Sequence, residues 1–123
     1  MPADQRLRRK SDFDAVFREG EGVASGPLAM RARKRTGQTM KQPCRFGFAV
    51  SSRLGGAVQR NRIRRRLRDS ARQLNAEGDC EGLDVVVIAR HGAAKADFKQ
   101  LKGTLRGLVG RSMRQLNADR GAS

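Results

Sequence analysis

The sequence predicts an α+β fold, in which a single domain packs helices on a sheet as an α-β sandwich in the order α-β-β-α-β-α. Two observations carry this prediction. The chain has 123 residues and no long low-complexity spacer, which fits one small domain. Segments with helical spacing of apolar residues also interleave with segments patterned like strands. The predicted helices cover residues 11–20, 57–74 and 95–116, and the predicted strands cover residues 23–35, 45–52 and 83–89.

The first predicted helix follows a short basic segment. Residues 1–10 lack a packing pattern and are expected to form a flexible arm. Ser11 and Asp14 have the spacing of a capping box, so structure is expected to begin at Ser11. Phe13 and Phe17 fall on one face of this helix, which glycines end. Phenylalanines in this pattern are more often core residues than platforms on which bases stack.

The next two segments have the alternation of strands with one solvent-facing side. Residues 23–35 place Arg31 among the basic side chains of that wet side, and residues 45–52 place Phe46 and Phe48 together on one side. A turn-rich connection, residues 36–43, separates them. We therefore expect these two strands to pair antiparallel.

The helix predicted at residues 57–74 has two contrasting faces. Its apolar residues form one stripe, consisting of Ile63, Leu67, Ala71 and Leu74. Seven arginines fall between positions 60 and 72, and most lie away from that stripe. Gly55 and Gly56 precede the helix and let the backbone turn sharply, leaving the first helical N–H groups open to an anion. One face is built for packing and the other for a polyanion.

The last two elements complete the core. Residues 83–89 are almost continuously Val and Ile, which is typical of a central strand buried on both faces. Residues 95–116 repeat apolar residues at helical intervals, although three glycines weaken the helix, so tertiary contacts must hold it. The folded domain is thus predicted at residues 11–116, and residues 117–123 are expected to be a disordered tail.

The charge of the chain indicates its partner. Its 27 Lys and Arg against 12 Asp and Glu give a formal net charge of +15 and a pI of about 11.6. Such an excess favours an anionic partner, and nucleic acid fits best. No apolar run reaches the roughly 18 residues of a membrane span, and the N-terminus lacks the apolar region of a secretory signal. We expect a cytoplasmic protein with no membrane partner and no obligate protein partner.

Arginine chemistry favours RNA phosphate as the ligand of the basic helix. The planar guanidinium group donates two parallel hydrogen bonds and stays charged. A solvated basic face without a dedicated ligand is the alternative, which the density of arginines makes unfavourable. Asn61 can bond RNA or cap a turn locally, and spacing does not decide between these roles.

Other reactive residues indicate no catalytic site and no metal coordination through sulfur, whereas the sequence leaves any protein ligands to magnesium unknown. Cys44 and Cys80 are far apart and lie outside any CxxC motif, so we interpret them as reduced thiols. Together with the single histidine, His91, they supply too few ligands for structural zinc, which takes about four. His91 has no neighbouring nucleophile or carboxylate in sequence and is interpreted as a surface residue. The chain shows no P-loop and no GxSxG motif.

Three segments together resemble the protein subunit of bacterial ribonuclease P. They read LRRKSDFDAVFREG at residues 7–20, RFGFAVSSRLGGAVQRNRIRRRLR at residues 45–68 and DVVVIAR at residues 84–90. Their order and spacing match as well, and the resemblance covers about residues 7–116. Its most specific part is GAVQRNRIRRRLR, which looks like the family's arginine-asparagine-arginine motif.

The resemblance implies a function in precursor tRNA processing. It implies that an RNA subunit is the catalyst, which removes the 5′ leader with bound magnesium ions, and that the protein assists it. The implied partners are therefore the catalytic RNA and precursor tRNA. The resemblance also implies a left-handed β-α-β crossover, contrary to the strong right-handed preference of such units.

The resemblance further implies two sets of site residues. The basic helix lies against the catalytic RNA, and a cleft between the sheet and the first helix receives the leader. At the position where the family often has an aromatic residue, this chain has Arg31, which could replace stacking by a cationic contact. The RNA-binding set is Arg53, Arg60, Asn61, Arg62, Arg64, Arg65, Arg68 and Arg72, and the cleft set is Phe13, Phe17, Arg31, Phe46 and Phe48.

Two other functions are weighed against this one. A structural RNA-binding protein would use the same basic helix but would not distinguish precursor from mature tRNA. A protein nuclease acting alone would need an acid-base pair or a metal cluster, and the sequence offers no compelling candidate for either.

Overall fold

The computed structural model describes residues 6–7, 9–35, 42–78 and 80–121, with side chains described as far as Leu116. Most of the predicted arm, the predicted turn at residues 36–41 and the end of the predicted tail lie outside the described residues. The elements in chain order are α1 (Lys10–Glu19), β1 (Glu21–Ser25), β2 (Leu28–Lys34), β3 (Arg45–Ala49), the short 3-10 helix η3 (Ser52–Leu54), α2 (Ala57–Glu77), β4 (Leu83–Ala89) and α3 (Phe98–Gly121).

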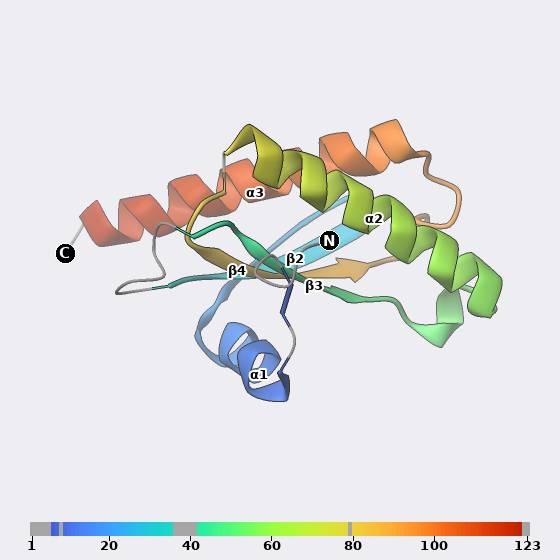
Figure 1. The fold of residues 1–123 in the computed structure, drawn as a ribbon, viewed down its shortest axis with the longest axis horizontal. Coiled ribbons are helices and arrows are strands. Elements are labelled where there is room, and N and C mark those ends of the chain that lie inside the picture. The colour runs from blue at the N-terminus through green and yellow to red at the C-terminus, as the bar shows by residue number, and fades with distance from the viewer. Residues whose placement is uncertain (1–5, 8, 36–41, 79, 122–123) are drawn as a thin grey trace.

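The strands form one sheet in the order β1-β2-β4-β3. The pairs β1-β2 and β2-β4 are antiparallel, and β3 runs parallel to β4. Helices α2 and α3 cover one face of this sheet, and α1 lies against the other (Figure 1). The α+β sandwich predicted from the sequence is confirmed, as is the central, buried place of β4.

The segment predicted as one long strand at residues 23–35 is a hairpin. Ser25 pairs with Leu28, and Gly26 and Pro27 make the turn between them. Gly26 has a φ of 52°, a conformation that glycine adopts without steric cost. Glycine at the first of two turn residues is a recognised hairpin signal, so the Gly-Pro pair could have revealed the extra strand.

The predicted antiparallel pairing of the second and third sequence segments is wrong. Strand β2 has β1 on one side and β4 on the other, which leaves no edge for β3. Strand β3 instead joins β4 through α2, as a β-α-β unit. An alternating pattern specifies which face of a strand is buried but not which strand lies beside it.

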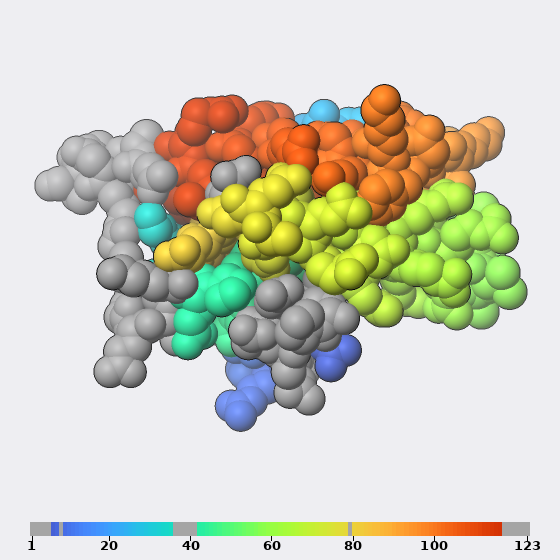
Figure 2. All heavy atoms as spheres, turned by 45° about the horizontal axis from the view of Figure 1, so that its top comes forward, coloured from blue at the N-terminus to red at the C-terminus, as the bar shows by residue number. Residues whose placement is uncertain are grey.

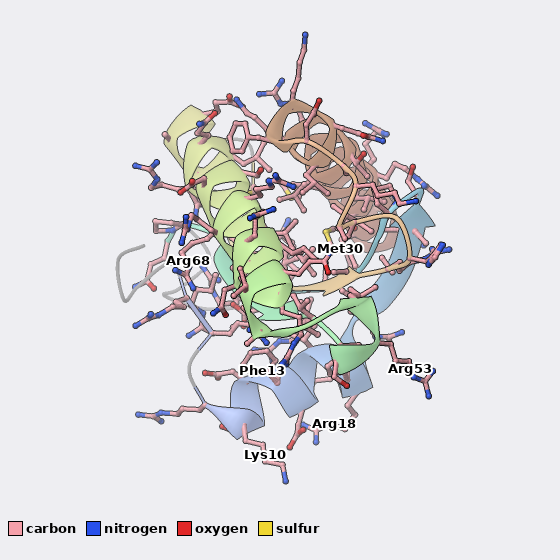
Figure 3. The ribbon with its side chains drawn as sticks, turned by 90° about the vertical axis from the view of Figure 1, so that its right-hand side faces the viewer. Lys10, Phe13, Arg18, Met30, Arg53 and Arg68 are labelled. Carbon is pink, nitrogen blue, oxygen red and sulfur yellow. The ribbon has the colours of Figure 1, made fainter. Side chains whose placement is uncertain are left out.

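The β3-α2-β4 crossover is left-handed. In Figure 1, β3 runs from left to right, the chain returns above the sheet as α2, and β4 again runs to the right. Figure 3, the view from the right-hand side of Figure 1, places β3 to the left of β4, so that β3 is the nearer strand in Figure 1. These positions give the hand that the family resemblance implies and that parallel strand connections rarely adopt.

The main core lies between the sheet and the two helices above it. The predicted stripe of α2 is buried: Ile63, Leu67, Ala71 and Leu74 all have exposed fractions of 1% or less. Helix α2 packs on α3 and β3, and its stripe belongs to one apolar cluster with side chains of α3 and the sheet. A smaller cluster under α1 contains Val16 and Val86. Because the apolar side of α2 is anchored in this way, its remaining sides are held outward.

The ends of two elements differ from the prediction. Helix α1 begins at Lys10, and no side chain caps its N-terminus, so the capping box expected at Ser11 does not form. Leu7, expected in the flexible arm, is 5% exposed, and its N–H donates to the carbonyl oxygen of Phe46 over 3.0 Å. Helix α3 continues to Gly121, through residues expected to be disordered. The leucine packs because the exposed edge of β3 and the surface under α1 meet at that point.

Candidate nucleic-acid interface

The outer side of α2 is a strip of basic and polar side chains. Five of the eight residues in the predicted RNA-binding set are exposed along it: Asn61, Arg62, Arg65, Arg68 and Arg72. Figure 2 shows the side chains of α2 as a continuous surface beside those of α3, and in Figure 3 Arg68 extends from α2 on the side away from α3. We call these five residues the α2 strip.

Two arginines at the side of α2 are more enclosed. Arg60 and Arg64 are half-buried, and Arg64 Nη1 donates to Asn61 Oδ1 over 3.3 Å. This bond joins two side chains within α2, so it is neither the turn cap nor the RNA contact that the sequence left open. The buried Nε of Arg60 has no hydrogen-bond partner among the described residues.

Arg66 has a structural role. Its Nη1 donates to the carbonyl oxygen of Ala96 over 2.9 Å, which ties α2 to the connection between β4 and α3. Arg72 lies 3.7 Å from Asp69 in an exposed ion pair of the kind that contributes little stability. The arginines of α2 therefore divide between those that bond within the protein and those that face solvent.

Arg53 extends the basic surface beyond α2. It lies in η3, it is exposed, and its N–H donates to Ser51 Oγ over 3.2 Å. Gly55 follows with a φ of 134°, and a Cβ at this position would overlap the side chain of Gln59. Glycine is thus required for the turn that places Arg53 immediately before the first turn of α2.

A second candidate surface lies on the opposite face of the sheet, beside α1. The ring of Phe13 lies on Gly47, where any Cβ would overlap it, and it also packs near Ile88. Phe17, one helical turn further on, is 46% exposed. Phe13 therefore belongs to the packing of α1 on the sheet, whereas Phe17 presents much of its ring to solvent. The structure brings these two predicted cleft residues to the same side of α1.

Arg31 joins α1 to the sheet at the same place. Its Nη2 donates to the carbonyl oxygens of Phe17 and Gly20, over 3.1 Å and 2.6 Å. These carbonyls belong to the C-terminal end of α1, which favours a positive charge. Arg31 thus lies beside Phe17, and its guanidinium group is partly used to hold the helix.

Phe46 and Phe48 do not line this cleft, and their assignment to it is wrong. Phe46 is fully buried in the main core, and Phe48 packs against the same cluster. Their rings stack with centroids 6.2 Å apart. Gly47 between them faces α1, so both phenylalanines point to the helices on the other face.

The sequence reasoning missed a buried ionic network on the α1 face. The carboxylate of Asp84 is fully buried and meets three guanidinium groups across neighbouring strands. Arg45 binds both of its oxygens, over 2.8 and 2.7 Å, while Arg35 Nη1 and Arg33 Nη2 approach at 2.7 and 3.0 Å. Arg33 also donates to Glu19 of α1 over 3.0 Å. A polar residue within the apolar run of β4 was the signal that could have found this network.

The arginines around Asp84 control its protonation. Burial acts to raise the pKa of Asp84, but hydrogen bonds from Arg45, Arg35 and Arg33 outweigh it, so the pKa lies below its ordinary value of 3.8. The hydrogen bond from Arg33 likewise lowers the pKa of Glu19. Both carboxylates are therefore charged at neutral pH and occupied by cations of the same chain.

Neither carboxylate nor thiol groups assemble into a metal site in the described part of the chain. No three His, Cys, Asp or Glu residues gather there in an arrangement that could hold a metal ion. Cys44 and Cys80 are buried and do not form a disulfide, and burial raises the pKa of the Cys44 thiol. Among the described helices, none is long and apolar enough to cross a membrane.

Comparison with known proteins identifies the family. A family model described as "Ribonuclease P" matches residues 1–113. The chain belongs to the ribonuclease P protein family. Among curated relatives, a ribonuclease P protein component of Gluconacetobacter diazotrophicus is 39% identical over 101 residues, covering 82% of this chain and 84% of the relative. Another, from Listeria monocytogenes, is 35% identical over 117 residues and covers 94% and 95% of the two chains.

Solved structures of the ribonuclease P protein family share the fold. The protein from Thermotoga maritima is 29% identical, with a TM-score of 0.73, over 86% of this chain and 96% of that chain. The protein from Staphylococcus aureus is 26% identical, with a TM-score of 0.71, over 85% and 92% of the two chains. The resemblance drawn from the three sequence segments is therefore confirmed.

Proposed function

We propose that this chain is the protein subunit of a ribonuclease P that binds the catalytic RNA through the α2 strip and the 5′ leader of precursor tRNA through the cleft beside α1. Membership of the family supports the subunit role in tRNA processing. The observation that carries the residue assignment is the exposure of the α2 strip on a helix whose opposite side is buried in the core.

The proposal assigns the chemistry to the RNA subunit. The composition of the candidate interface supports this assignment, because its described residues are chiefly arginines and phenylalanines. Arginine stays protonated and binds phosphate, but it is a poor general base. The buried carboxylate Asp84 is occupied by three guanidinium groups, so it is not free to accept a proton from water.

Magnesium enters the proposal through RNA. RNA strands that approach one another need cations to offset their phosphate charge, and a protein with a net charge of +15 supplies some of that charge. The protein is thus expected to lower the magnesium concentration at which catalytic RNA and precursor tRNA associate. Precursor tRNA is a cytoplasmic molecule in bacteria, so the proposal also places the protein in the cytoplasm.

Cleavage of precursor tRNA at low magnesium tests the proposal directly. Catalytic RNA alone, protein alone and the two together are incubated with a precursor that carries a labelled 5′ leader. We expect release of the leader in the mixture and little or none from either component. Cleavage by the protein alone would assign the chemistry to the protein and contradict the proposal.

Affinity measurements distinguish the proposal from the remaining alternative, a structural RNA-binding protein. A protein that only fastens folded RNA would bind the catalytic RNA but would have equal affinity for precursor and mature tRNA in the complex. Measuring both affinities with the assembled complex decides between the two functions. We expect the complex to prefer the precursor, because only the precursor carries a leader for the cleft.

A further inference from the structure

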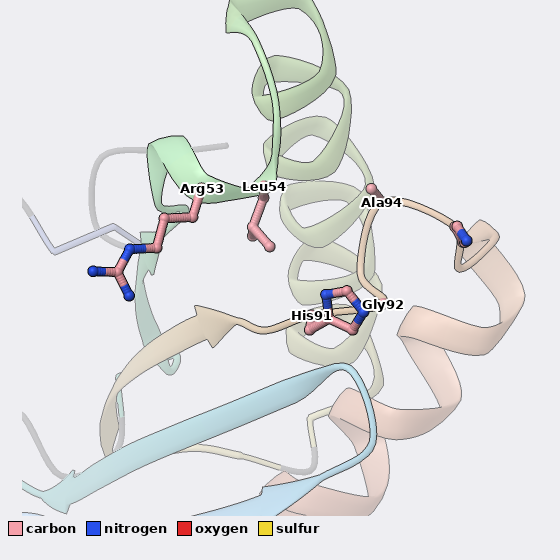
Figure 4. Close-up of a pocket in the computed structure, with 6 residues that line it drawn as sticks. Arg53, Leu54, His91, Gly92 and Ala94 are labelled. Atoms are coloured by element: carbon pink, nitrogen blue, oxygen red, sulfur yellow. The ribbon is translucent and has the colours of Figure 1, made fainter.

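A small pocket lies next to the start of α2, beside Arg53. It has a volume of about 160 Å³ and is lined by residues of η3 and of the connection between β4 and α3. Figure 4 shows the Leu54 side chain on one side of this space and His91 and Gly92 on another. The lining residues are Arg53, Leu54, His91, Gly92, Ala94 and Lys95.

The size of the pocket limits its occupant to one small group. Pockets for drug-sized ligands usually measure about 300–1,000 Å³. A space of about 160 Å³ is smaller than these, yet it exceeds the roughly 30 Å³ that a single water molecule occupies. It is thus of the right order for one planar ring system.

The walls combine apolar and ring surfaces. Leu54 and Ala94 are half-buried and pack at the border of the main core, so their outer atoms form a firm apolar lining. The exposed ring of His91 supplies a flat surface with polar edges. A nucleobase suits such a site, because its faces stack on apolar and aromatic groups while its edges form hydrogen bonds.

The charges around the pocket favour a polyanion. Arg53 and Lys95 are both exposed, and no carboxylate of the described residues pairs with either of them or with His91. The lining contains no acidic residue. Cations beside an apolar pocket can hold the phosphates on either side of a base that enters it.

We infer that this pocket receives one unstacked nucleobase of the catalytic RNA, with Arg53 and Lys95 binding the adjacent phosphates. The catalytic RNA is favoured over the leader because the pocket adjoins the first turn of α2 and borders the core beneath α2 and α3, whereas α1 lies on the opposite face. The inference rests on the proposed function and adds to it a site that binds a single base of the catalytic RNA.

Nuclear magnetic resonance with free nucleotides tests the pocket in the wild-type protein. Isotope-labelled protein is titrated with AMP, GMP, CMP and UMP and, separately, with ribose 5-phosphate, which lacks the base. We expect at least one nucleotide to shift the resonances of Leu54, His91, Gly92 and Ala94, and ribose 5-phosphate not to do so. Equal shifts with ribose 5-phosphate would show a simple anion site and overturn the inference, as would no shift with any nucleotide.

Two variants test the pocket in the assembled complex. His91→Ala removes the ring, and Ala94→Phe fills the space; Gln115→Phe adds an equal side chain on the exposed side of α3 as the control. We expect each pocket variant to lower the affinity for the catalytic RNA by about tenfold, as loss of one stacked base does, and the control to match wild type. Because Ala94→Phe could disturb folding, His91→Ala decides the outcome, and wild-type affinity for it would overturn the inference. Leader cleavage by the wild-type complex tests the proposed function separately.

Discussion

At the scale of single residues, the least expected feature is the buried carboxylate of Asp84. Its partners come from two neighbouring strands, because the register aligns Arg33, Asp84 and Arg45 in a row across the sheet. The sequence shows each residue but not the register, so the network could not be derived from it. The same limit explains Phe46 and Phe48, whose alternation was recognised but whose side of the sheet was not.

Replacing Asp84 by Asn should strongly destabilise the fold. The substitution removes the buried negative charge that pairs with three guanidinium groups, and losing one partner of a buried ion pair typically costs about 3–5 kcal/mol. The free energy of unfolding from urea titration measures the effect. The control is Asp69→Asn, which breaks an exposed pair with Arg72 and should cost at most about 1 kcal/mol. Equal losses for the two variants would contradict this account.

Stability should also fall in acid because of Asp84. The pKa of this carboxylate is lower in the folded state than in the unfolded state. Its contribution to stability is therefore complete at pH values above the unfolded-state pKa. The contribution is lost as the pH falls through the folded-state pKa. The loss for Asp84 should therefore begin near its ordinary value of 3.8 and continue below it. Melting temperatures between about pH 6 and pH 2 would show a steep acid limb in wild type. In Asp84→Asn the melting temperature should fall less steeply with decreasing pH. The same steepness as in wild type would show that Asp84 does not cause the loss of stability in acid.

Phe17 should contribute to leader binding rather than to stability. Nearly half of its ring is exposed beside the cleft, so Phe17→Ala removes little buried area but a surface on which a base can stack. We expect the complex with this variant to bind precursor tRNA about tenfold more weakly and mature tRNA unchanged. Thermal melting of the free variant provides the control. A large loss of melting temperature with no selective loss of precursor would instead identify Phe17 as a core residue.

At the scale of elements, the sequence predicted the type of secondary structure of each segment more reliably than the neighbours of each strand in the sheet. Helix α2 was predicted well because its apolar stripe and its arginines occupy separate sides of one helix. The hairpin between β1 and β2 was missed because Gly26 and Pro27 were read as part of one strand, although the inward-facing positions change phase there, from Val23 to Leu28 and Met30. The partner of β3 depends on a crossover whose hand contradicts the general rule, so only family resemblance could supply it.

Truncating arginines of the α2 strip should weaken assembly in proportion to the phosphates lost. Arg65→Ala and Arg68→Ala should each lower the affinity for catalytic RNA and reduce the slope of log affinity against log salt by about 1. Arg106→Ala is the matched control, since Arg106 is equally exposed but lies on α3 in an ion pair with Glu77. Binding titrations over a range of potassium concentrations measure the slope. An effect of Arg106→Ala as large as that of Arg65→Ala would remove the distinction between α2 and the rest of the surface.

At the scale of the whole molecule, charge opposes folding. A net charge of +15 on a chain of 123 residues creates self-repulsion that salt reduces, because the Debye length falls from about 30 Å at 0.01 M to about 8 Å at 0.15 M ionic strength. We expect the melting temperature of the free protein to rise by several degrees over this range. Calorimetry at constant pH checks it. A melting temperature that fell with salt would show that attractive ion pairs, such as those at Asp84, outweigh the repulsion.

Arg6 and Leu7 pair with the outer edge of β3, and this position bears on self-association of the protein. On one side β3 is bound to β4, and on the other the described part of the chain pairs with it at Arg6 and Leu7, through a bridge and a hydrogen bond to Phe46. An uncovered strand edge is a template for another copy of the same chain. Mutual repulsion keeps copies apart while the protein is free, but RNA neutralises that charge. Arg6 and Leu7 therefore occupy part of this edge at the stage when charge repulsion between copies is reduced.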